Sequence, residues 1–387
     1  MSQGYPGGSG QGYGQQGYGQ PGYGQGGYGQ GFGQQPGLGS QPGFGSSYPP
    51  AWQQPAWGQP QGQPAGYGMP QPQGGFPPPQ APRPKGRLRP VLLAALAILG
   101  LAIAGFVINS MRQPAYQNED YTPPPPGNVK PFPEPDTDDL KAITDDNALY
   151  KQQVPVPVRC ELRDPNMNIK TASDRQVKDY IDDLMACNMR VWNPPFTATG
   201  KYELVRPVVN IYSESVTSPC GGGKAMGPNA MYCAANQQVY YSRKIQDVHP
   251  ALAVMAEPHV VDEVMAHEFG HAIQARTLIL QANQYQQVKS SDKKTALELS
   301  RRIEVQADCF AGMYLQSVSR SMNYTDKNWQ DIQTAIKNGG DDTLTGKPNV
   351  EGNHGLGDSR LYWAQIGLTN TDIGKCNTMT APSQFVR

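Results

Sequence analysis

The stretch His267-Glu268-Phe269-Gly270-His271 decides which fold this chain is expected to have. It follows the pattern H-E-x-x-H inside residues 260–280, whose composition predicts a helix. Residues four apart on a helix lie on one face, so both imidazoles can bind a single metal ion. Zinc lowers the pKa of a bound water to about 7, and the Glu268 carboxylate can take its proton. The pattern therefore indicates hydrolytic chemistry, most often on a peptide bond.

A third metal ligand is expected on a later helix. Residues 292–318 have helical composition, and Ser291 is a plausible N-cap. Glu304 and Asp308 are four apart and share a face of apolar and small side chains, where an unpaired buried charge is very costly. Glu304 would complete a His2Glu set that leaves a fourth position for water. Asp308 would accept a hydrogen bond from a ligand histidine and so fix its tautomer.

Each of these patterns has a simpler explanation. The first can occur by chance on a solvated helix face, although only five histidines are present and two of them flank a glutamate at this spacing. Glu304 and Asp308 can instead form ion pairs with Arg301 or Arg302. Because the two patterns together supply a complete ligand set, a zinc site is favoured over both alternatives.

Both patterns resemble the motifs of the bacterial neutral zinc metallopeptidases, which are membrane-anchored proteins. That family has an H-E-x-G-H helix and a later E-x-Q-A-D-C-x-A-G helix, matched here by residues 267–271 and 304–312. The resemblance covers roughly residues 160–378. Its further matches are Pro219-Cys220-Gly221, Tyr232-Cys233, Val239-Tyr240, Gly340-Asp341-Asp342, His354-Gly355, Arg360-Leu361-Tyr362-Trp363 and Cys376-Asn377-Thr378. The chain departs from the family at Gly357-Asp358, where small hydroxyl residues are expected. The resemblance implies a peptidase without naming its substrate.

An α+β, zincin-like metallopeptidase domain is predicted, with a small sheet packed on helices. Ser173 begins a helix with a capping box to Gln176, and Asn193-Pro194-Pro195 is expected to end it. Residues 204–212 and 238–242 are rich in Val and Tyr, which predicts strands. Residues 238–242 are the candidate for an edge strand beside the site, where a substrate backbone can pair.

The chain is predicted to have four parts. Residues 1–89 form a tail rich in Gly, Tyr, Gln and Pro, which is expected to be disordered in the cytoplasm. Residues 90–111 contain an unbroken apolar run and are expected to form one transmembrane signal-anchor helix. Residues 112–158 are Pro-rich and acidic, which predicts an extended spacer. Residues 159–387 are expected to form the peptidase domain.

The orientation follows from the charges around the apolar run. Basic residues precede it and an acidic stretch follows, so the positive-inside rule places the tail inside and the domain outside the cell membrane. A cleaved signal peptide is the alternative, but the preceding region is far too long for one. The Tyr-containing repeats of the tail allow weak self-association, with an inert spacer as the simpler interpretation.

All six cysteines follow the apolar run, and an even number in an exported segment predicts disulfides. The family resemblance, together with closeness along the chain, favours the pairs Cys160–Cys187, Cys220–Cys233 and Cys309–Cys376. Cysteine as a zinc ligand is the alternative. It is disfavoured because the His2Glu set already supplies the ligands.

The combined prediction is an extracytoplasmic, membrane-anchored zinc peptidase with one Zn2+ per chain. His267, His271 and Glu304 would hold the metal. Glu268 would be the general base. His354 would stabilise the oxyanion, with a packing role in its loop as the alternative.

Two other functions are the alternatives to this one. A non-catalytic, zinc-stabilised binding module on a membrane scaffold would not need Glu268. In the second alternative the tail carries the main function, by clustering proteins under the membrane. The expected partner is a peptide or protein substrate in the cell envelope. Balanced charge, 32 basic against 32 acidic residues, gives no sign of nucleic-acid binding. His249 and His259 are expected to be surface residues.

Overall fold

The computed structural model describes residues 114–127 and 129–387, together with Ala95, Ile98 and Leu99. The predicted tail and almost all of the predicted membrane segment lie outside these residues. Within the described part, no helix has the length and apolar character needed to cross a membrane.

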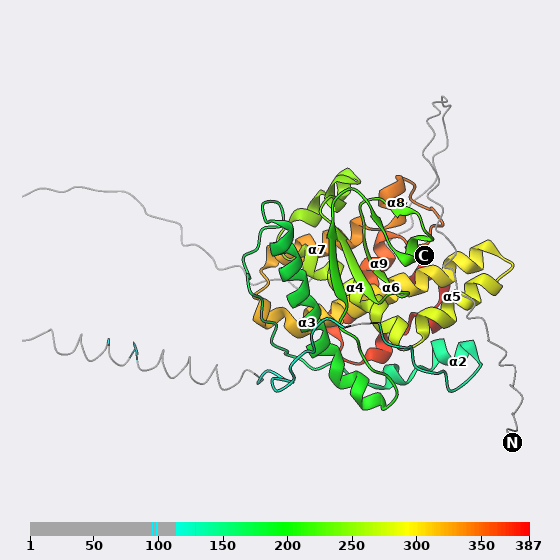
Figure 1. Cartoon of the computed structure of the whole chain (residues 1–387), viewed down its shortest axis with the longest axis horizontal. Helices are drawn as coiled ribbons and strands as arrows, with labels where there is room; N and C mark the ends of the chain where they lie inside the picture. Colours follow the sequence, from blue (N-terminus) through cyan, green and yellow to red (C-terminus); the bar gives the residue numbers. More distant parts are fainter. Residues whose placement is uncertain (1–94, 96–97, 100–113, 128) are drawn as a thin grey trace, which may run out of the picture. The chain divides into compact units, whose positions relative to one another are not determined.

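Helices dominate the described chain (Figure 1). They are α2 (Leu140–Asp145), α3 (Asp174–Thr199), α4 (Val260–Arg276), α5 (Ile279–Lys289), α6 (Lys293–Met322), α7 (Asp326–Asn338), α8 (Asp341–Thr345) and α9 (Gly357–Thr369). The long helix α6 packs on α9 through glycines. A Cβ atom on Gly312 would lie 2.3 Å from the Ala364 carbonyl oxygen, and one on Gly367 would lie 2.0 Å from that of Cys309. The two helix backbones can approach this closely only because both side chains are missing.

Five short strands form two small sheets, so the described fold is α+β. They are β1 (Val208–Tyr212), β2 (Val216–Thr217), β3 (Ala225–Met226), β4 (Ala230–Cys233) and β5 (Gln238–Ser242). β5 lies between β1 and β4, parallel to the first and antiparallel to the second, while β2 and β3 pair separately.

The prediction that residues 238–242 form an edge strand is wrong. β5 is the central strand and four of its five residues are buried. Its Val and Tyr side chains mark a strand, but they do not show which neighbours flank it. The strand predicted over residues 204–212 is shorter in the structure and comprises only β1.

Helix ends agree only in part with the sequence patterns. The capping box of Ser173 and Gln176 is present at the start of α3. The predicted end at Pro194-Pro195 is wrong, because α3 continues through both prolines to Thr199, with Gly200 as its C-cap at φ of 64°. Phe196, one residue beyond the prolines, is 1% exposed, so burial of this last turn offsets the lost helix hydrogen bonds. Asp292, not Ser291, is the N-cap of α6 and accepts from the backbone of Lys294 and Thr295.

The extended spacer predicted for residues 112–158 is wrong for much of the described segment. Leu149, Val154 and Val158 belong to the hydrophobic core. The Tyr150 hydroxyl lies 2.8 Å from the Gln306 amide nitrogen on α6. These side chains are apolar or hydrogen-bonded to the helices, so this part of the chain belongs to the folded domain.

Three disulfides connect the elements of the domain. The pairs are Cys160–Cys187, Cys220–Cys233 and Cys309–Cys376, as the resemblance implied. The first joins the segment before α3 to α3 itself. The second closes the β2–β3 hairpin against the end of β4. The third ties α6 to the C-terminal segment.

Candidate metal and catalytic site

His267 and His271 on α4 and Glu304 on α6 come together in the structure. The Glu304 Oε2 atom lies 3.4 Å from His267 Nε2 and 3.7 Å from His271 Nε2. One ligand atom from each of the three residues falls within 4.8 Å of the others. The two sequence motifs, more than thirty residues apart along the chain, therefore form one cluster.

Gly270 allows the two helices to approach closely enough for this cluster. A Cβ atom at this position would lie 3.0 Å from the Ala307 Cα atom on α6. Any larger side chain would push α4 and α6 apart at the turn between the two histidines. The glycine in the first motif and the alanine in the second are therefore small for a packing reason.

The donor set fits a zinc ion. Tetrahedral zinc with ligands at about 2.0–2.1 Å requires ligand atoms roughly 3.3–3.5 Å apart. The two carboxylate–imidazole distances, 3.4 and 3.7 Å, are close to this separation. Both imidazoles use Nδ1 for hydrogen bonds to protein oxygens, which leaves the Nε2 lone pairs free for a metal.

Asp308 orients His267, as predicted from the sequence. His267 Nδ1 donates to the Asp308 carboxylate at 2.8 Å, and the carboxylate is completely buried. Arg360 on α9 donates to both oxygens of the same carboxylate, at 2.9 Å each. Burial raises the pKa of Asp308, but the charges of Arg360 and His267 hold it below its usual value.

Gln274 performs the matching role for His271. Its amide oxygen accepts from His271 Nδ1 at 2.8 Å. Its amide nitrogen donates to the Ile303 carbonyl oxygen on α6 at 2.8 Å, which fixes the orientation of the amide. Gln274 lies three residues after His271 on the same helix face, so its helical spacing is a signal for this role, although the sequence patterns above did not include it.

The pKa shifts at the cluster follow from its buried charges. Burial raises the pKa of Glu304, but the nearby His271 and His267 hold it well below its usual range, so the carboxylate is ionised. Burial lowers the pKa of His267, and Asp308 more than reverses this, so the net shift is well upward. Glu263, one turn before His267, is also buried; burial and the Asp308 carboxylate raise its pKa to about 7.

Glu268 lies beside the cluster and contacts the sheet. Its carboxylate accepts a hydrogen bond from the Tyr232 backbone N–H on β4, at 2.5 Å. The side chain is largely buried. The strand that lies next to the candidate site is thus β4, not the predicted β5.

His354 lies in the loop between α8 and α9. Its Nδ1 atom is 3.1 Å from Asp341 Oδ1, and 45% of its side chain is exposed. Burial lowers the pKa of His354, while Asp341 and the charge of Glu304 raise it, with a net upward shift. The imidazole is therefore within electrostatic range of the metal cluster. Asp341 was noted in the sequence only as part of a family match.

The structure rules out one alternative for the acidic residues and corrects one expectation about a histidine. Arg301 and Arg302 do not pair with Glu304 or Asp308; instead they donate to the C-terminal segment, for example to the carbonyl oxygens of Val386 and Thr378. His259 is not a simple surface residue. Its Nδ1 lies 3.0 Å from the buried Asp262 carboxylate, and its side chain is 17% exposed.

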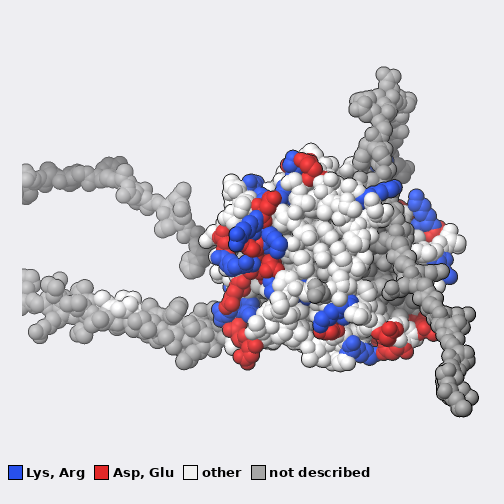
Figure 2. Space-filling model, viewed as in Figure 1, with Lys and Arg blue, Asp and Glu red and all other residues white. Residues whose placement is uncertain are grey.

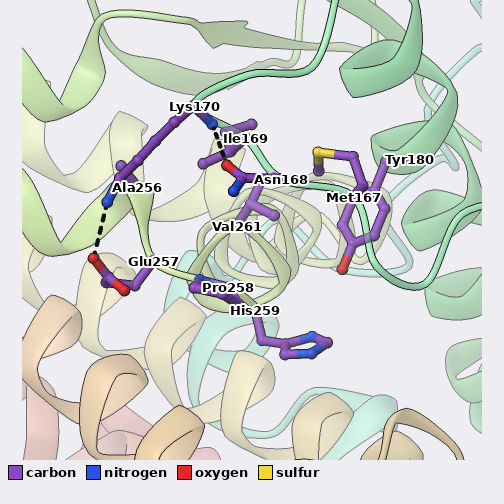
Figure 3. A pocket seen from close by; sticks show the side chains of 10 residues that line it. All are labelled: Met167, Asn168, Ile169, Lys170, Tyr180, Ala256, Glu257, Pro258, His259 and Val261. Carbon is purple, nitrogen blue, oxygen red and sulfur yellow. Dashed lines mark hydrogen bonds and ion pairs between the residues drawn. The ribbon is translucent and has the colours of Figure 1, made fainter.

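A separate small pocket lies at the beginning of α4 (Figure 3). It has a volume of about 210 Å3 and lies beside His259, Tyr180 and Met167. An ion pair of 3.0 Å joins Lys170 and Glu257 at its rim. The metal cluster is not part of its lining.

Charged side chains are mixed in sign on the face seen in Figure 2. Lys, Arg, Asp and Glu lie side by side over α3, and much of the central surface is uncharged. Near α3, Arg163 pairs with Asp179, Asp182 and Asp183. This face therefore has no broad basic patch of the kind that binds nucleic acid.

Sequence comparison places this arrangement in a known family. The family described as "Putative neutral zinc metallopeptidase" matches residues 145–379, more than half of the chain. The chain belongs to this family. Family membership implies zinc as the metal of the cluster, and the match begins inside the segment first predicted as a spacer.

The similar curated proteins carry no stated activity. "Uncharacterized protein YpfJ" of Escherichia coli is 28% identical over 215 residues, which cover 53% of this chain and 72% of that protein. "Uncharacterized protein Rv2575" of Mycobacterium tuberculosis is 27% identical over 208 residues, 49% of this chain and 67% of that protein. No solved structure matches the chain. The zincin-like part of the fold prediction thus stays a prediction.

Proposed function

We propose that this protein is a zinc-dependent peptidase that acts on peptide or protein substrates in the cell envelope. One observation carries the proposal: Glu268 lies next to a His2Glu cluster but contributes no atom to it. A site that only binds metal needs the three ligands alone. A carboxylate held beside them is the group that hydrolysis requires.

His267, His271 and Glu304 would hold one Zn2+ per chain. When bound, zinc supplies a Lewis acid that makes water acidic near neutral pH and polarises a carbonyl group. Asp308 and Gln274 keep the two imidazoles in the tautomer with a free Nε2 lone pair. Glu304 brings a negative charge that the positive ion offsets.

Glu268 would act as the general base. Its carboxylate accepts the proton from the attacking water and later gives it to the leaving amine. The Tyr232 N–H holds one carboxylate oxygen in place. Because this hydrogen bond comes from the backbone of a strand, it positions the carboxylate without depending on a flexible side chain.

The outer edge of β4 offers a place for the substrate backbone. The Asn229 carbonyl accepts from Ser242 on β5, so alternate residues of this strand point toward β5. Ala230 and Tyr232 therefore point their backbone groups to the other side, where Tyr232 meets Glu268. An extended peptide would pair with this edge and place a peptide bond beside the cluster.

His354 would stabilise the negative charge that develops on the substrate carbonyl oxygen. Its half-exposed side chain leaves one ring edge accessible, and it lies in electrostatic range of Glu304. The disulfides support an extracytoplasmic site for this chemistry, because such bonds persist in oxidising compartments. The apolar run within residues 90–111 would provide the membrane anchor.

The decisive experiment uses the full-length protein, in which zinc content and cleavage of a diverse peptide library are measured together. Glu268→Gln should keep about one zinc per chain and lose roughly 10²–10⁴-fold in hydrolysis. Glu304→Ala should lose most of its zinc. Glu257→Gln, which breaks only the ion pair with Lys170, is the matched control and should behave as wild type.

Two results would refute the proposal. Full zinc occupancy in Glu304→Ala would remove the ligand assignment. Absence of cleavage by the zinc-loaded wild type, together with full complementation of a deletion strain by Glu268→Gln, would make the domain a zinc-stabilised binding module.

A further inference from the structure

Asp341 makes three hydrogen bonds to the loop that carries His354. One carboxylate oxygen lies 3.1 Å from His354 Nδ1. The other accepts from the backbone N–H groups of His354 and Gly355, at 2.9 Å each. The Asp341 side chain is 10% exposed, whereas the His354 side chain is 45% exposed. A buried carboxylate thus holds a half-exposed imidazole by one ring edge.

The loop is built around this carboxylate. A Cβ atom on Gly352 would lie 2.2 Å from an Asp341 oxygen, so only glycine leaves room for it. Gly355 has φ of 97°, a conformation that glycine adopts without strain. Arg301 on α6 donates to the Gly352 carbonyl oxygen at 2.8 Å. The loop is thereby attached to α6 one turn before Glu304.

The chemistry of the pair limits which proton His354 can offer. An ionised carboxylate only accepts hydrogen bonds, so Nδ1 must carry a proton. In the neutral imidazole Nε2 then has a lone pair and cannot donate. Only the imidazolium has a second N–H, on Nε2, at the ring edge that faces away from Asp341.

We propose that Asp341 is a positioning residue that keeps His354 in the imidazolium form, with Nε2–H as the donor to the substrate oxyanion. The donor role rests on the proposed peptidase function, but the protonation state of the pair does not. Activity should therefore end at alkaline pH, where His354 loses its proton and, with it, the Nε2 donor.

Asp341 on α8 is the charge that favours the imidazolium, and Arg360 on α9 is the opposing positive charge. Glu304 on α6 is also negative, but a zinc ion bound to it would offset its charge. Among the described residues, Glu304 forms its ion pairs within 4.0 Å with His267 and His271 and not with His354. Direct contact thus comes from Asp341, so this carboxylate is the one to change.

The test is a nitrogen NMR titration of the zinc-loaded full-length protein labelled at histidine. The chain has five histidines, and a His354→Gln variant assigns the signal. Wild type should show Nδ1–H as the neutral tautomer of His354. Asp341→Asn should lower the pKa of His354 by at least about 1, the usual effect of losing an adjacent opposite charge. Asp342→Asn is the matched control, because Asp342 holds the same loop through the Gly357 N–H and should leave this pKa unchanged.

Activity provides the second measurement. The alkaline limb of kcat/KM should move to lower pH in Asp341→Asn by the same amount as the His354 pKa, and should not move in Asp342→Asn. A neutral Nε2–H tautomer in wild type would overturn the proposal, and so would an unchanged His354 pKa in Asp341→Asn. If that variant does not fold, the wild-type tautomer decides. If wild type cleaves no peptide, the peptidase function fails while the titration still tests the pair.

Discussion

Arg360 donates two hydrogen bonds of 2.9 Å to Asp308, one to each carboxylate oxygen. The Asp308 carboxylate is completely buried and also accepts from His267 Nδ1. Without the guanidinium, the buried Asp308 carboxylate would lie near the second buried acid, Glu263, with little positive charge to offset it. Arg360 on α9 therefore supports the candidate metal ligand His267 on α4, because it holds the Asp308 carboxylate on α6 in place.

Changing this arginine should weaken metal binding without removing a ligand. Arg360→Lys keeps the positive charge but cannot bind both oxygens at once. Zinc affinity, measured by competition with a chelator, should fall by about 10–100-fold, the usual effect of losing an outer hydrogen-bond partner. The zinc affinity of Asp308→Asn should fall by a factor in the same range.

The control for that experiment is Arg276→Lys. Arg276 lies on the same helix as the two histidines, but it donates to the carbonyl oxygens of Glu203 and Pro131. The zinc affinity of the Arg276→Lys variant should equal that of wild type. Equal losses in Arg276→Lys and Arg360→Lys would mean that general destabilisation, not the contact with Asp308, accounts for the effect.

The pair of Asp341 and His354 should make stability depend on pH in two directions. Burial raises the pKa of Asp341, but His354 and the backbone N–H groups hold it below its usual value, so its stabilisation is lost as pH falls through the lowered pKa. The pKa of His354 is raised, so its stabilisation is present below the unfolded value and lost as pH rises through the raised one.

Asp341→Asn should therefore destabilise the protein most between about pH 4 and 6.5, which are the unfolded pKa values of the Asp341 carboxyl and the His354 imidazole. In this window the free energy of unfolding should fall by about 1.5–3 kcal/mol, as for other hydrogen bonds to charged groups. Urea unfolding of wild type and variant at several pH values measures the difference. A difference that stays constant from acid to alkaline pH would contradict the ion pair.

The Tyr232 N–H should matter for hydrolysis and not for metal binding. Tyr232→Pro removes this donor to Glu268, and proline is tolerated on edge strands where the N–H faces away from the sheet. The variant should keep its zinc and lose about 10-fold or more in kcat/KM, since one carboxylate contact is gone. Tyr232→Phe keeps the N–H and should lose far less. Similar losses in both variants would assign the effect to the side chain.

Removing the disulfide with the longest loop should lower the free energy of unfolding more than removing the disulfide with the shortest loop. The Cys309–Cys376 loop spans 67 residues and the Cys220–Cys233 loop spans 13. Loop entropy predicts losses of about 4 and about 3 kcal/mol for the two double Cys→Ala variants. Chemical unfolding of the oxidised proteins gives both values. A larger loss for the shorter loop would show that native contacts, and not chain entropy, dominate.

Local patterns predicted the parts of the site that lie on single helices. His267 and His271, like Glu304 and Asp308, are four residues apart, and helical geometry alone puts each pair on one face. The capping box at Ser173 was predicted for the same reason, since it depends on residues three apart. Family resemblance, rather than periodicity, supplied the disulfide pairing.

The sequence by itself therefore determined the two metal-site motifs and the helices that carry them. Only the tertiary structure decided which partners meet them: Arg360 at Asp308, Tyr232 at Glu268 and Asp341 at His354. It also decided that β5 is central and β4 forms the edge beside the site. The physical reason is distance along the chain. Helical spacing is set by neighbouring peptide units, whereas these contacts join residues on separate elements, whose packing depends on the whole core.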